Sequence, residues 1–349
     1  MVTDRVRVLI TFALEPELVD EIAAVDARLD VRVLGQEARR LFRGGRGYPS
    51  ELEAQTARQE LEEAMAEAEV LLGFWGPALM ELYPDPQALR ERAPHLRWIQ
   101  LTSAGVDRAA RSGLLESDLM VTNASGLHAT PIGEYVMLQM LMFAKGAHRF
   151  VRAQERREWQ RWMPQELYGK TVGIVGMGHI GAEVARLSLA FGCRVIATRR
   201  SAAERHDEGG VDVLPASELP TLLAESDFVV LSMPLTEETR NMIGEAELRA
   251  MKPTAVLINI ARGAVVDEAA LVRALKDGTI AGAGLDVFEE EPLPEGSELW
   301  GLENVILSPH ISGGTEIYNK RATDIFRENL RRYLAGEPLI NLADRNRGY

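Results

Sequence analysis

One segment, Lys170–Ser201, constrains the fold of this chain more than any other. In order, it holds a predicted strand at Thr171–Val175, a turn with Gly176, Gly178 and Gly181, a predicted helix at Ala182–Ala190 and a predicted strand at Arg194–Thr198. In such a unit the glycines allow a tight turn, a close backbone approach to a pyrophosphate and close packing of helix on strand. The N–H groups and the dipole of the helix N-terminus then attract the phosphates. We predict a dinucleotide site here; a glycine turn that serves packing alone is the alternative.

The end of the second predicted strand indicates which dinucleotide binds. Arg199, Arg200 and Ser201 stand where such units usually carry an acidic residue for the ribose hydroxyls. A carboxylate would repel a 2′-phosphate, whereas a guanidinium binds one with two parallel hydrogen bonds and a second arginine can stack on the adenine. The pattern favours NADP(H), with NAD(H) as the alternative cofactor. A solvated basic pair at a strand end is the other interpretation.

Composition and charge limit the partners and the compartment. The 349 residues suit two domains, and 46% hydrophobic with 26% charged residues is typical of a soluble globular protein. A net charge of −13 argues against a nucleic-acid or anionic-membrane surface. The single cysteine, Cys193, cannot form an internal disulfide, and no apolar stretch has the length of a membrane span. We expect a cytoplasmic protein with no metal site, no nucleic-acid partner and no membrane partner.

Strand and helix patterns alternate along the chain. Further predicted strands lie at Arg5–Phe12, Val31–Leu34, Val70–Trp75, Trp98–Thr102, Leu119–Thr122, Val211–Leu214, Phe228–Ser232, Ala255–Asn259, Gly282–Val287 and Val305–Leu307. Predicted helices include Ser50–Ala68, the apolar Ile132–Ala144 and the amphipathic Glu316–Ala335, and the basic Arg149–Arg161 is expected to be an exposed helix or an arm. The alternation predicts an α/β protein with two doubly wound parallel-sheet domains and a cleft between them. We expect a flavodoxin-like substrate domain at 1–125, completed by 314–349, and a Rossmann nucleotide-binding domain at 126–313.

Charged side chains follow three neighbouring strands of the second predicted domain. Arg262 comes shortly after one strand, Asp286 and Glu291 come with and after the next, and His310 comes after the last. Ligands of doubly wound sheets bind outside the carboxyl ends of the strands, so these side chains are expected on the side of the sheet where the cofactor binds. One cation, one carboxylate and one imidazole that follow three strands on one side of the sheet therefore form a candidate catalytic group.

These residues stand in stretches that resemble the D-isomer-specific 2-hydroxyacid dehydrogenase family over nearly the whole chain. The matching stretches are ELYGKTVGIVGMGHIG, SMPLTEETRNMI, INIARGAVVDEAAL, AGLDVFEEEPLP and LSPHISGGT, in the family's order and approximate spacing. The resemblance implies Arg262, Glu291 and His310 as the catalytic residues. It also implies a homodimer through the nucleotide-binding domain, with the Ile132–Ala144 helix as a contributor. Arg199, where the family usually has Asp, matches the glyoxylate/hydroxypyruvate reductase branch.

The resemblance further implies binding residues. Pro234 shapes the turn beneath the nicotinamide ribose, and Thr239 and Asp286 contact the cofactor. Further cofactor contacts are expected from Gly176, Gly178, His179, Ile180, Gly181, Arg199, Arg200, Ser201, Ala261, Arg262, His310 and Gly313, and substrate contacts from Trp75, Ala104, Gly105, Arg262 and His310. For Trp75 a place in the core is an equal alternative. Of the remaining histidines, His179 is expected to contribute its backbone, and His128 has no comparable partner.

The chemistry of 2-oxo acid reduction suits these residue types. Arg262 can hold the carboxylate and polarise the ketone in fork geometry, and His310, supported by Glu291, can donate the proton while hydride arrives from the nicotinamide. The separate alternatives are a surface arginine, a solvated acidic run and a histidine that caps a turn. Their joint occurrence with a dinucleotide motif favours the catalytic interpretation.

Other functions exist on the same scaffold. A formate dehydrogenase is expected to replace the glutamate by glutamine, so Glu291 argues against that activity, and a phosphite dehydrogenase is a further enzyme alternative. A nucleotide-sensing corepressor can keep the same three residues, but this chain lacks long disordered tails and a basic segment. We therefore expect NAD(P)H-dependent reduction of a small 2-oxo acid, such as glyoxylate or hydroxypyruvate, to the D-2-hydroxy acid.

Overall fold

The computed structural model describes residues 5–39, 51–103 and 105–344. The chain divides into two compact units, Met1–Leu127 with Glu316–Tyr349, and His128–Thr315. The boundaries expected from the sequence, after residue 125 and after residue 313, fall close to these divisions. The substrate and nucleotide roles of the two domains stay predictions.

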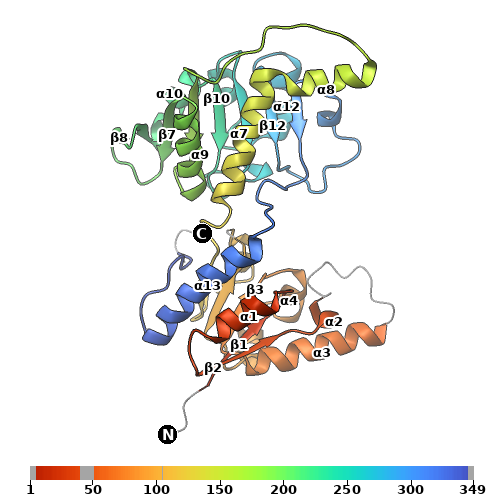
Figure 1. Ribbon diagram of the computed structural model, residues 1–349, viewed down its shortest axis with the longest axis vertical. Helices are drawn as coiled ribbons and strands as arrows, with labels where there is room; N and C mark the ends of the chain where they lie inside the picture. Colours follow the sequence, from red (N-terminus) through yellow and green to blue (C-terminus); the bar gives the residue numbers. More distant parts are fainter. Residues whose placement is uncertain (1–4, 40–50, 104, 345–349) are drawn as a thin grey trace. The chain divides into compact units, whose positions relative to one another are not determined.

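The first unit is a five-stranded parallel sheet in the order β2-β1-β3-β4-β5, which is the flavodoxin-like order (Figure 1). Its strands are β1 (Val6–Ile10), β2 (Leu29–Val33), β3 (Val70–Gly73), β4 (Trp98–Leu101) and β5 (Met120–Thr122). Its helices are α1 (Pro16–Ala23), α2 (Gln36–Arg39), α3 (Glu51–Glu67), α4 (Pro77–Leu82), α5 (Pro86–Arg92), α6 (Asp107–Arg111) and α13 (Tyr318–Ala335).

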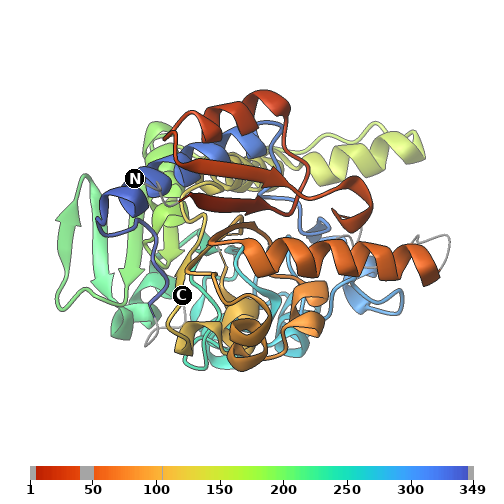
Figure 2. The ribbon, with the colours of Figure 1, turned by 90° about the horizontal axis from the view of Figure 1, so that it is seen from below.

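Helices cover both faces of this sheet. Successive side chains of a strand point to opposite faces, so Val8 and Ile10 pack in the core under α1 and α13, while Leu9 packs in the core under α3, α4 and α5. Figure 2 shows α1 and α13 together on one side of the strands and α3 on the other. The C-terminal helix α13 therefore completes the N-terminal unit, as the sequence predicts.

The second unit is an eight-stranded sheet in the order β13-β12-β11-β10-β6-β7-β9-β8. Its strands are β6 (Thr171–Val175), β7 (Arg194–Arg199), β8 (His206–Glu208), β9 (Val211–Pro215), β10 (Phe228–Leu231), β11 (Val256–Asn259), β12 (Gly282–Leu285) and β13 (Val305–Leu307). Its helices are α7 (Ala129–Lys145), α8 (Ala147–Arg156), α9 (His179–Ala190), α10 (Leu219–Glu225), α11 (Glu245–Ala250) and α12 (Glu268–Lys276). All pairings are parallel except that of β8 with β9.

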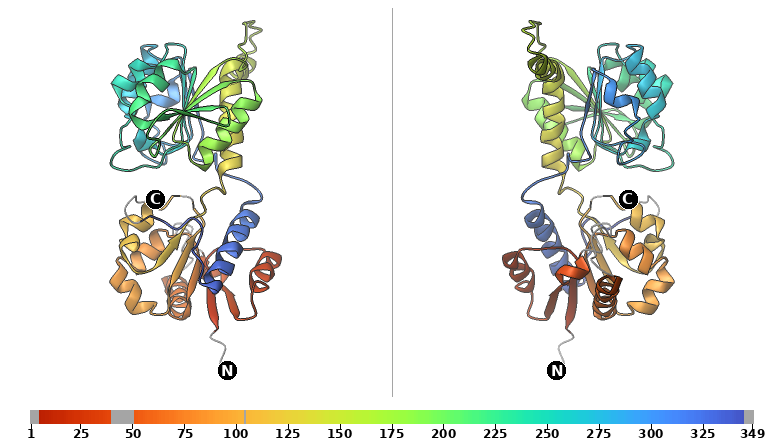
Figure 3. Two further views of the ribbon diagram at one scale, coloured as in Figure 1. Left: turned by 90° about the vertical axis from the view of Figure 1, so that its left-hand side faces the viewer. Right: turned by 90° about the vertical axis from the view of Figure 1, so that its right-hand side faces the viewer.

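Two layers of helices enclose this second sheet. Helices α7 and α9 pack on one face, and α10, α11 and α12 pack on the other (Figure 3). Two glycines of β12 let α7 lie close to the sheet: a Cβ at Gly284 would come within 2.8 Å of Gln139 Oε1, and a Cβ at Gly282 within 2.8 Å of Phe143 Cε1. The apolar segment predicted as a buried helix therefore covers the half of the sheet that carries the candidate catalytic residues.

The architecture confirms the predicted fold class of parallel sheets with helices in two domains. Every predicted strand occurs, with ends that move by a few residues, but β8 was not predicted because His206–Glu208 is short, polar and exposed. The stretch Arg149–Arg161, expected to be a helix or an arm, is helical in its first part only. The helix α8 ends at Arg156 because Arg157 takes a left-handed conformation, with a φ of 58°. In the described parts of the chain, no helix is long and apolar enough to cross a membrane.

Candidate active site

The three glycines of the predicted dinucleotide motif differ in what requires them. Gly176 has a φ of 101°, and a Cβ there would lie 2.9 Å from the Met233 nitrogen. A Cβ at Gly181 would lie 2.3 Å from the Gly176 carbonyl oxygen, so this glycine allows α9 to pack against the turn. A Cβ at Gly178 would meet no protein atom within 4 Å. Packing therefore requires the first and third glycines, whereas the second suits the close approach of a pyrophosphate to the N-terminus of α9.

Arg199 lies at the end of β7, where the cofactor preference was predicted to be set. Its Nη1 and Nη2 donate to Oε2 and Oε1 of Glu208 over 2.6 and 2.9 Å. This fork raises the pKa of Arg199 and lowers the pKa of Glu208. Nη1 of Arg200 lies 3.7 Å from Oε2 of Glu238, and Ser201 is exposed. The sequence did not predict that Arg199 faces a carboxylate, because Glu208 belongs to the strand that carried no apolar pattern.

A second turn on the same edge of the sheet follows β10. The Thr239 hydroxyl donates to the Pro234 carbonyl over 2.8 Å and accepts from the Thr236 amide over 2.7 Å. Thr239 thereby closes the turn that begins at Pro234. Its role as a cofactor contact stays a prediction, and its role in fixing the turn is observed.

The loop after β11 carries Arg262. Asn259 shapes this loop, because its Oδ1 accepts from the Ala261 amide over 3.1 Å and its Nδ2 donates to the Arg262 carbonyl over 3.0 Å. The Arg262 guanidinium donates through Nη1 to the Ala261 carbonyl over 2.7 Å. The short Asn259 side chain, which has both a donor and an acceptor, therefore holds the loop of Arg262 at the end of the strand.

Gly263 brings the loop after β11 against the loop after β12. A Cβ at Gly263 would lie 1.8 Å from the Phe288 carbonyl carbon and 2.3 Å from the Glu289 nitrogen. The Phe288 amide in turn donates to Oε1 of Glu291 over 3.1 Å. Arg262 and Glu291 therefore stand on two loops that touch, and no residue larger than glycine fits between them.

Glu291 and His310 form a hydrogen-bonded pair. Nδ1 of His310 lies 2.8 Å from Oε2 of Glu291 and donates to it, because a carboxylate only accepts. Since Oε1 already accepts from a backbone amide, both oxygens of Glu291 have a partner. The His310 side chain is 49% exposed, so part of the ring faces solvent. The predicted catalytic pair is therefore assembled within the second unit.

Asp286 holds the loop that carries His310. It is fully buried, and its Oδ1 accepts from Ser308 Oγ over 2.5 Å and from the Ile311 amide over 2.9 Å. Its Oδ2 accepts from the Ser312 amide over 2.9 Å. No sequence pattern reveals such bonds to backbone amides, so this role of Asp286 was missed. Its predicted contact with the cofactor stays a prediction.

The remaining predicted residues have mixed outcomes. Trp75 is 2% exposed and its indole N–H donates to Ser112 Oγ over 2.9 Å, so the structure supports the core alternative and not a pocket wall. His128 Nδ1 donates to the Gly313 carbonyl over 3.1 Å, a bond to the backbone and not to a carboxylate such as the one that His310 has. Gly105 follows β4 in the first unit and is partly exposed. Ala104 lies outside the described residues.

Comparisons with known proteins show which proteins this chain is similar to. Residues 137–312 match the family model of the D-isomer specific 2-hydroxyacid dehydrogenase, NAD binding domain. The chain is 41% identical over 281 residues to a glyoxylate reductase of Korarchaeum cryptofilum, covering 76% of this chain and 82% of that protein. It is 39% identical over 303 residues to a glyoxylate reductase of Pyrococcus furiosus, covering 82% and 85%.

Two solved structures resemble the whole chain. One is a D-isomer specific 2-hydroxyacid dehydrogenase from Xanthobacter autotrophicus in complex with NADPH, with a TM-score of 0.78, 32% identity, and coverage of 99% of this chain and 100% of that one. The other is an NADPH-dependent glyoxylate/hydroxypyruvate reductase from Sinorhizobium meliloti in complex with NADP, with a TM-score of 0.78, 27% identity and the same coverage. The chain belongs to the D-isomer specific 2-hydroxyacid dehydrogenase family. It is therefore an NAD(P)-dependent oxidoreductase of 2-hydroxy and 2-oxo acids.

Proposed function

We propose that this enzyme uses NADPH to reduce glyoxylate to glycolate, or hydroxypyruvate to its D-2-hydroxy acid. The observation that carries the proposal is the Glu291–His310 pair beside the loop of Arg262, on the same sheet edge as the glycine turn. The glyoxylate reductases of Korarchaeum and Pyrococcus support the substrate class. The NADPH complexes of the Xanthobacter and Sinorhizobium proteins support the cofactor.

Each catalytic residue has a separate task in the proposed reaction. When bound, the nicotinamide supplies hydride to the ketone carbon. Arg262 binds the carboxylate of the 2-oxo acid and polarises its carbonyl, and His310 donates a proton through Nε2 to the carbonyl oxygen. Glu291 holds Nδ1–H and stabilises the positive charge of the ring before transfer. Because the His310 side chain is half-exposed, the ring regains its proton from solvent.

Gly105 is the remaining candidate for substrate binding. We infer that the backbone amides near Ala104 and Gly105 hold the substrate carboxylate, as the family resemblance implies. Gly105 follows the carboxyl end of β4, where ligands of a doubly wound sheet bind. We do not assign Trp75 to this pocket, because its side chain is buried and its indole N–H is already bonded.

A panel of 2-oxo acids with NADPH and with NADH tests the proposal. We expect kcat/KM for glyoxylate or hydroxypyruvate to exceed that for larger 2-oxo acids, and NADPH to be preferred over NADH. A low kcat/KM for both small acids with rapid turnover of a bulkier one would refute the substrate assignment. Binding of NADPH without turnover of any 2-oxo acid would favour a nucleotide sensor instead, and oxidation of phosphite would favour the phosphite dehydrogenase alternative.

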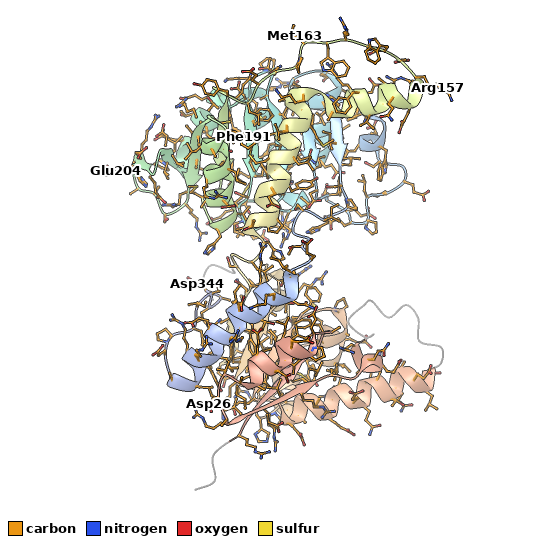
Figure 4. All side chains as sticks on the ribbon, in the orientation of Figure 1. Asp26, Arg157, Met163, Phe191, Glu204 and Asp344 are labelled. Carbon is orange, nitrogen blue, oxygen red and sulfur yellow. The ribbon has the colours of Figure 1, made fainter. Side chains whose placement is uncertain are left out.

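We also propose that two copies associate through α7, α8 and the segment after α8. Trp159 and Met163 on that segment are 91% and 90% exposed, and Phe150 and Val151 of α8 are about half-exposed. Figure 4 shows Met163 on the segment that follows α8 and Arg157 at the end of that helix. Large apolar side chains exposed together mark a protein interface. We place the dimer in the cytoplasm, with no nucleic-acid partner, because of the single cysteine and the acidic net charge of −13.

A large hollow beside this segment fits the dimer proposal better than a second active site. It has a volume of about 930 Å³ and its lining includes Arg152, Arg161, Trp162 and Lys170. Lys170 comes just before β6, so the hollow lies toward the amino ends of the parallel strands, opposite to the edge that carries His310. Ligands of doubly wound sheets bind at the carboxyl ends, so a partner chain is the better occupant of this hollow.

A further inference from the structure

We propose that Tyr135 is a positioning residue for His310 and acts through Ser308 and Asp286; the proposal rests on the catalytic role of His310 in the proposed function. Tyr135 stands on α7, far in the sequence from the catalytic loops. Its hydroxyl is hydrogen-bonded to Ser308 Oγ, and Gln139 Nε2 donates to it over 2.6 Å. A chain of four polar side chains therefore links the helix to the loop of the catalytic histidine.

The number of protons that each of these four side chains can donate determines the direction of the hydrogen bonds between them. The Asp286 carboxylate only accepts, so the one hydroxyl proton of Ser308 points to Asp286. Ser308 Oγ must therefore accept from the Tyr135 hydroxyl. Because the Tyr135 hydroxyl donates its proton to Ser308, its oxygen accepts from the amide nitrogen of Gln139. The hydrogen bonds therefore all point the same way, from the Gln139 amide nitrogen through Tyr135 and Ser308 to Asp286.

The hydrogen-bonded side chains connect to the backbone on both sides of His310. Ser308 lies two residues before the histidine, and the amides of Ile311 and Ser312, which follow it, donate to the two oxygens of Asp286. Between these anchors His310 takes a left-handed conformation with a φ of 54°, which is unfavourable for a residue with a Cβ. The surrounding bonds must hold that conformation, and with it the direction of the ring toward Glu291.

Packing also fixes Tyr135 and Gln139, the two hydrogen-bonded side chains on α7. Tyr135 is half-buried and Gln139 is buried, and Gly284 of β12 leaves the room that the Gln139 side chain occupies. Burial raises the pKa of Tyr135, so its hydroxyl keeps the proton that it donates. Oε1 of Gln139 is buried without a hydrogen-bond partner among the described residues, but the Tyr135 hydroxyl has a partner on each side. Breaking one of its two bonds would leave a further polar group unpaired, so the arrangement resists change. Loss of the Tyr135 hydroxyl should therefore loosen the His310 loop without unfolding the unit.

The test measures the single-turnover rate of NADPH oxidation with glyoxylate, or with the best acid of the panel. Tyr135→Phe should lower this rate roughly five- to tenfold, the usual effect of one lost hydrogen bond, while the Kd of NADPH and the KM of the acid change less than about twofold. Ser308→Ala should lower it similarly, and Ser308→Thr, which keeps a hydroxyl, should restore it. Tyr333→Phe is the matched control, because that part-buried hydroxyl also bonds a polar side chain, Glu69, but belongs to the other unit.

A His310→Ala background separates positioning from general destabilisation. If Tyr135 acts through His310, Tyr135→Phe should cause no further loss in that background, and a further loss of the same size would overturn the proposal. An unchanged rate in Tyr135→Phe alone, or an equal loss in Tyr333→Phe, would overturn it as well. If His310→Ala itself keeps the wild-type rate, the proposed function fails at its proton donor, which is a result distinct from these. Should Tyr135→Phe not fold, the Ser308→Ala and Ser308→Thr pair tests the same chain.

Discussion

The function of a single side chain in this enzyme depends on the neighbours that hold it in place. Glu291 illustrates this, because one oxygen accepts from the Phe288 amide of its own loop and the other accepts from His310. An aspartate at the same position would be one methylene shorter and could not make both bonds without moving the loop. The length of the glutamate therefore matters as much as its charge.

Replacements at His310 and Glu291 should lower the rate to different extents. His310→Ala should lower kcat for 2-oxo acid reduction by roughly 10²–10⁴, because the general acid is lost. Glu291→Gln keeps the shape but leaves one acceptor oxygen for two donors, the Phe288 amide and Nδ1 of His310, so kcat should fall only about tenfold. Steady-state measurement of kcat in both variants checks this. An unchanged kcat in Glu291→Gln would mean that the carboxylate does not hold the ring.

The cofactor preference is expected to depend on Arg199. Arg199→Ala should weaken NADPH binding roughly ten- to hundred-fold, because one charge-assisted fork to the 2′-phosphate is lost, and should leave NADH binding nearly unchanged. Alanine is a cleaner replacement than aspartate, which would face Glu208 across the former ion pair. Arg205→Ala is the control, because Arg205 makes a similar fork to Asp212. Equal losses for NADPH in both variants would remove Arg199 from the 2′-phosphate site.

At the scale of secondary-structure elements, apolar patterns predicted the elements that form the core and few others. The buried strands from Val6–Ile10 to Val305–Leu307 were predicted because each must present apolar side chains to a face. The strand β8 has only polar, exposed residues, so nothing in its composition distinguishes it from a loop. The candidate catalytic residues were predicted because they end neighbouring strands and match a family. The bonds of Asp286 and Tyr135 could not be predicted, since they depend on where backbone amides and distant helices lie.

One carboxylate, which accepts hydrogen bonds from two other segments of the second unit, should make the stability of that unit depend on pH. Asp227, just before β10, accepts from the Thr171 amide of β6 over 2.8 Å and from Lys252 Nζ over 3.0 Å. Burial alone would raise the pKa of Asp227, but these two donors outweigh it and lower the pKa below its ordinary value. The carboxylate therefore stabilises the fold above the ordinary pKa of an aspartate, and this contribution is lost as the pH falls through the lowered value.

Replacement of that carboxylate gives a measurable difference. Asp227→Asn should lower the free energy of unfolding at neutral pH by about 1–3 kcal/mol, and the difference from wild type should shrink as the pH falls below about 4. Denaturant unfolding at several pH values measures it. Asp118→Asn is the control, because Asp118 pairs with Arg90 at an exposed position, where such pairs contribute at most about 1 kcal/mol. A difference for Asp227→Asn that stays constant down to pH 2 would contradict the assignment.

At the scale of the whole molecule, the candidate catalytic residues and the proposed dimer surface belong to the same unit. Helix α7 carries Tyr135, which bonds to the loop of His310, and α8 follows it with only Gly146 between them. The exposed apolar residues Trp159 and Met163 lie just after α8. An interface formed there would include α8 and the adjoining α7, which bonds to the catalytic loop through Tyr135. Dimer formation is therefore expected to stabilise the unit that holds the chemistry.

The dimer surface can be tested by placing charges on it. The double variant Trp159→Glu with Met163→Glu should convert a dimer of the wild type into a monomer, because burial of two carboxylates in an apolar interface costs several kcal/mol. The molar mass from light scattering during size-exclusion chromatography measures this at micromolar concentration. Leu52→Glu is the matched control, because Leu52 is also a strongly exposed apolar residue but lies on α3 of the first unit, so this variant should remain dimeric. A wild type that elutes with the mass of one chain, or a double variant that stays dimeric, would show that the exposed segment after α8 serves another purpose.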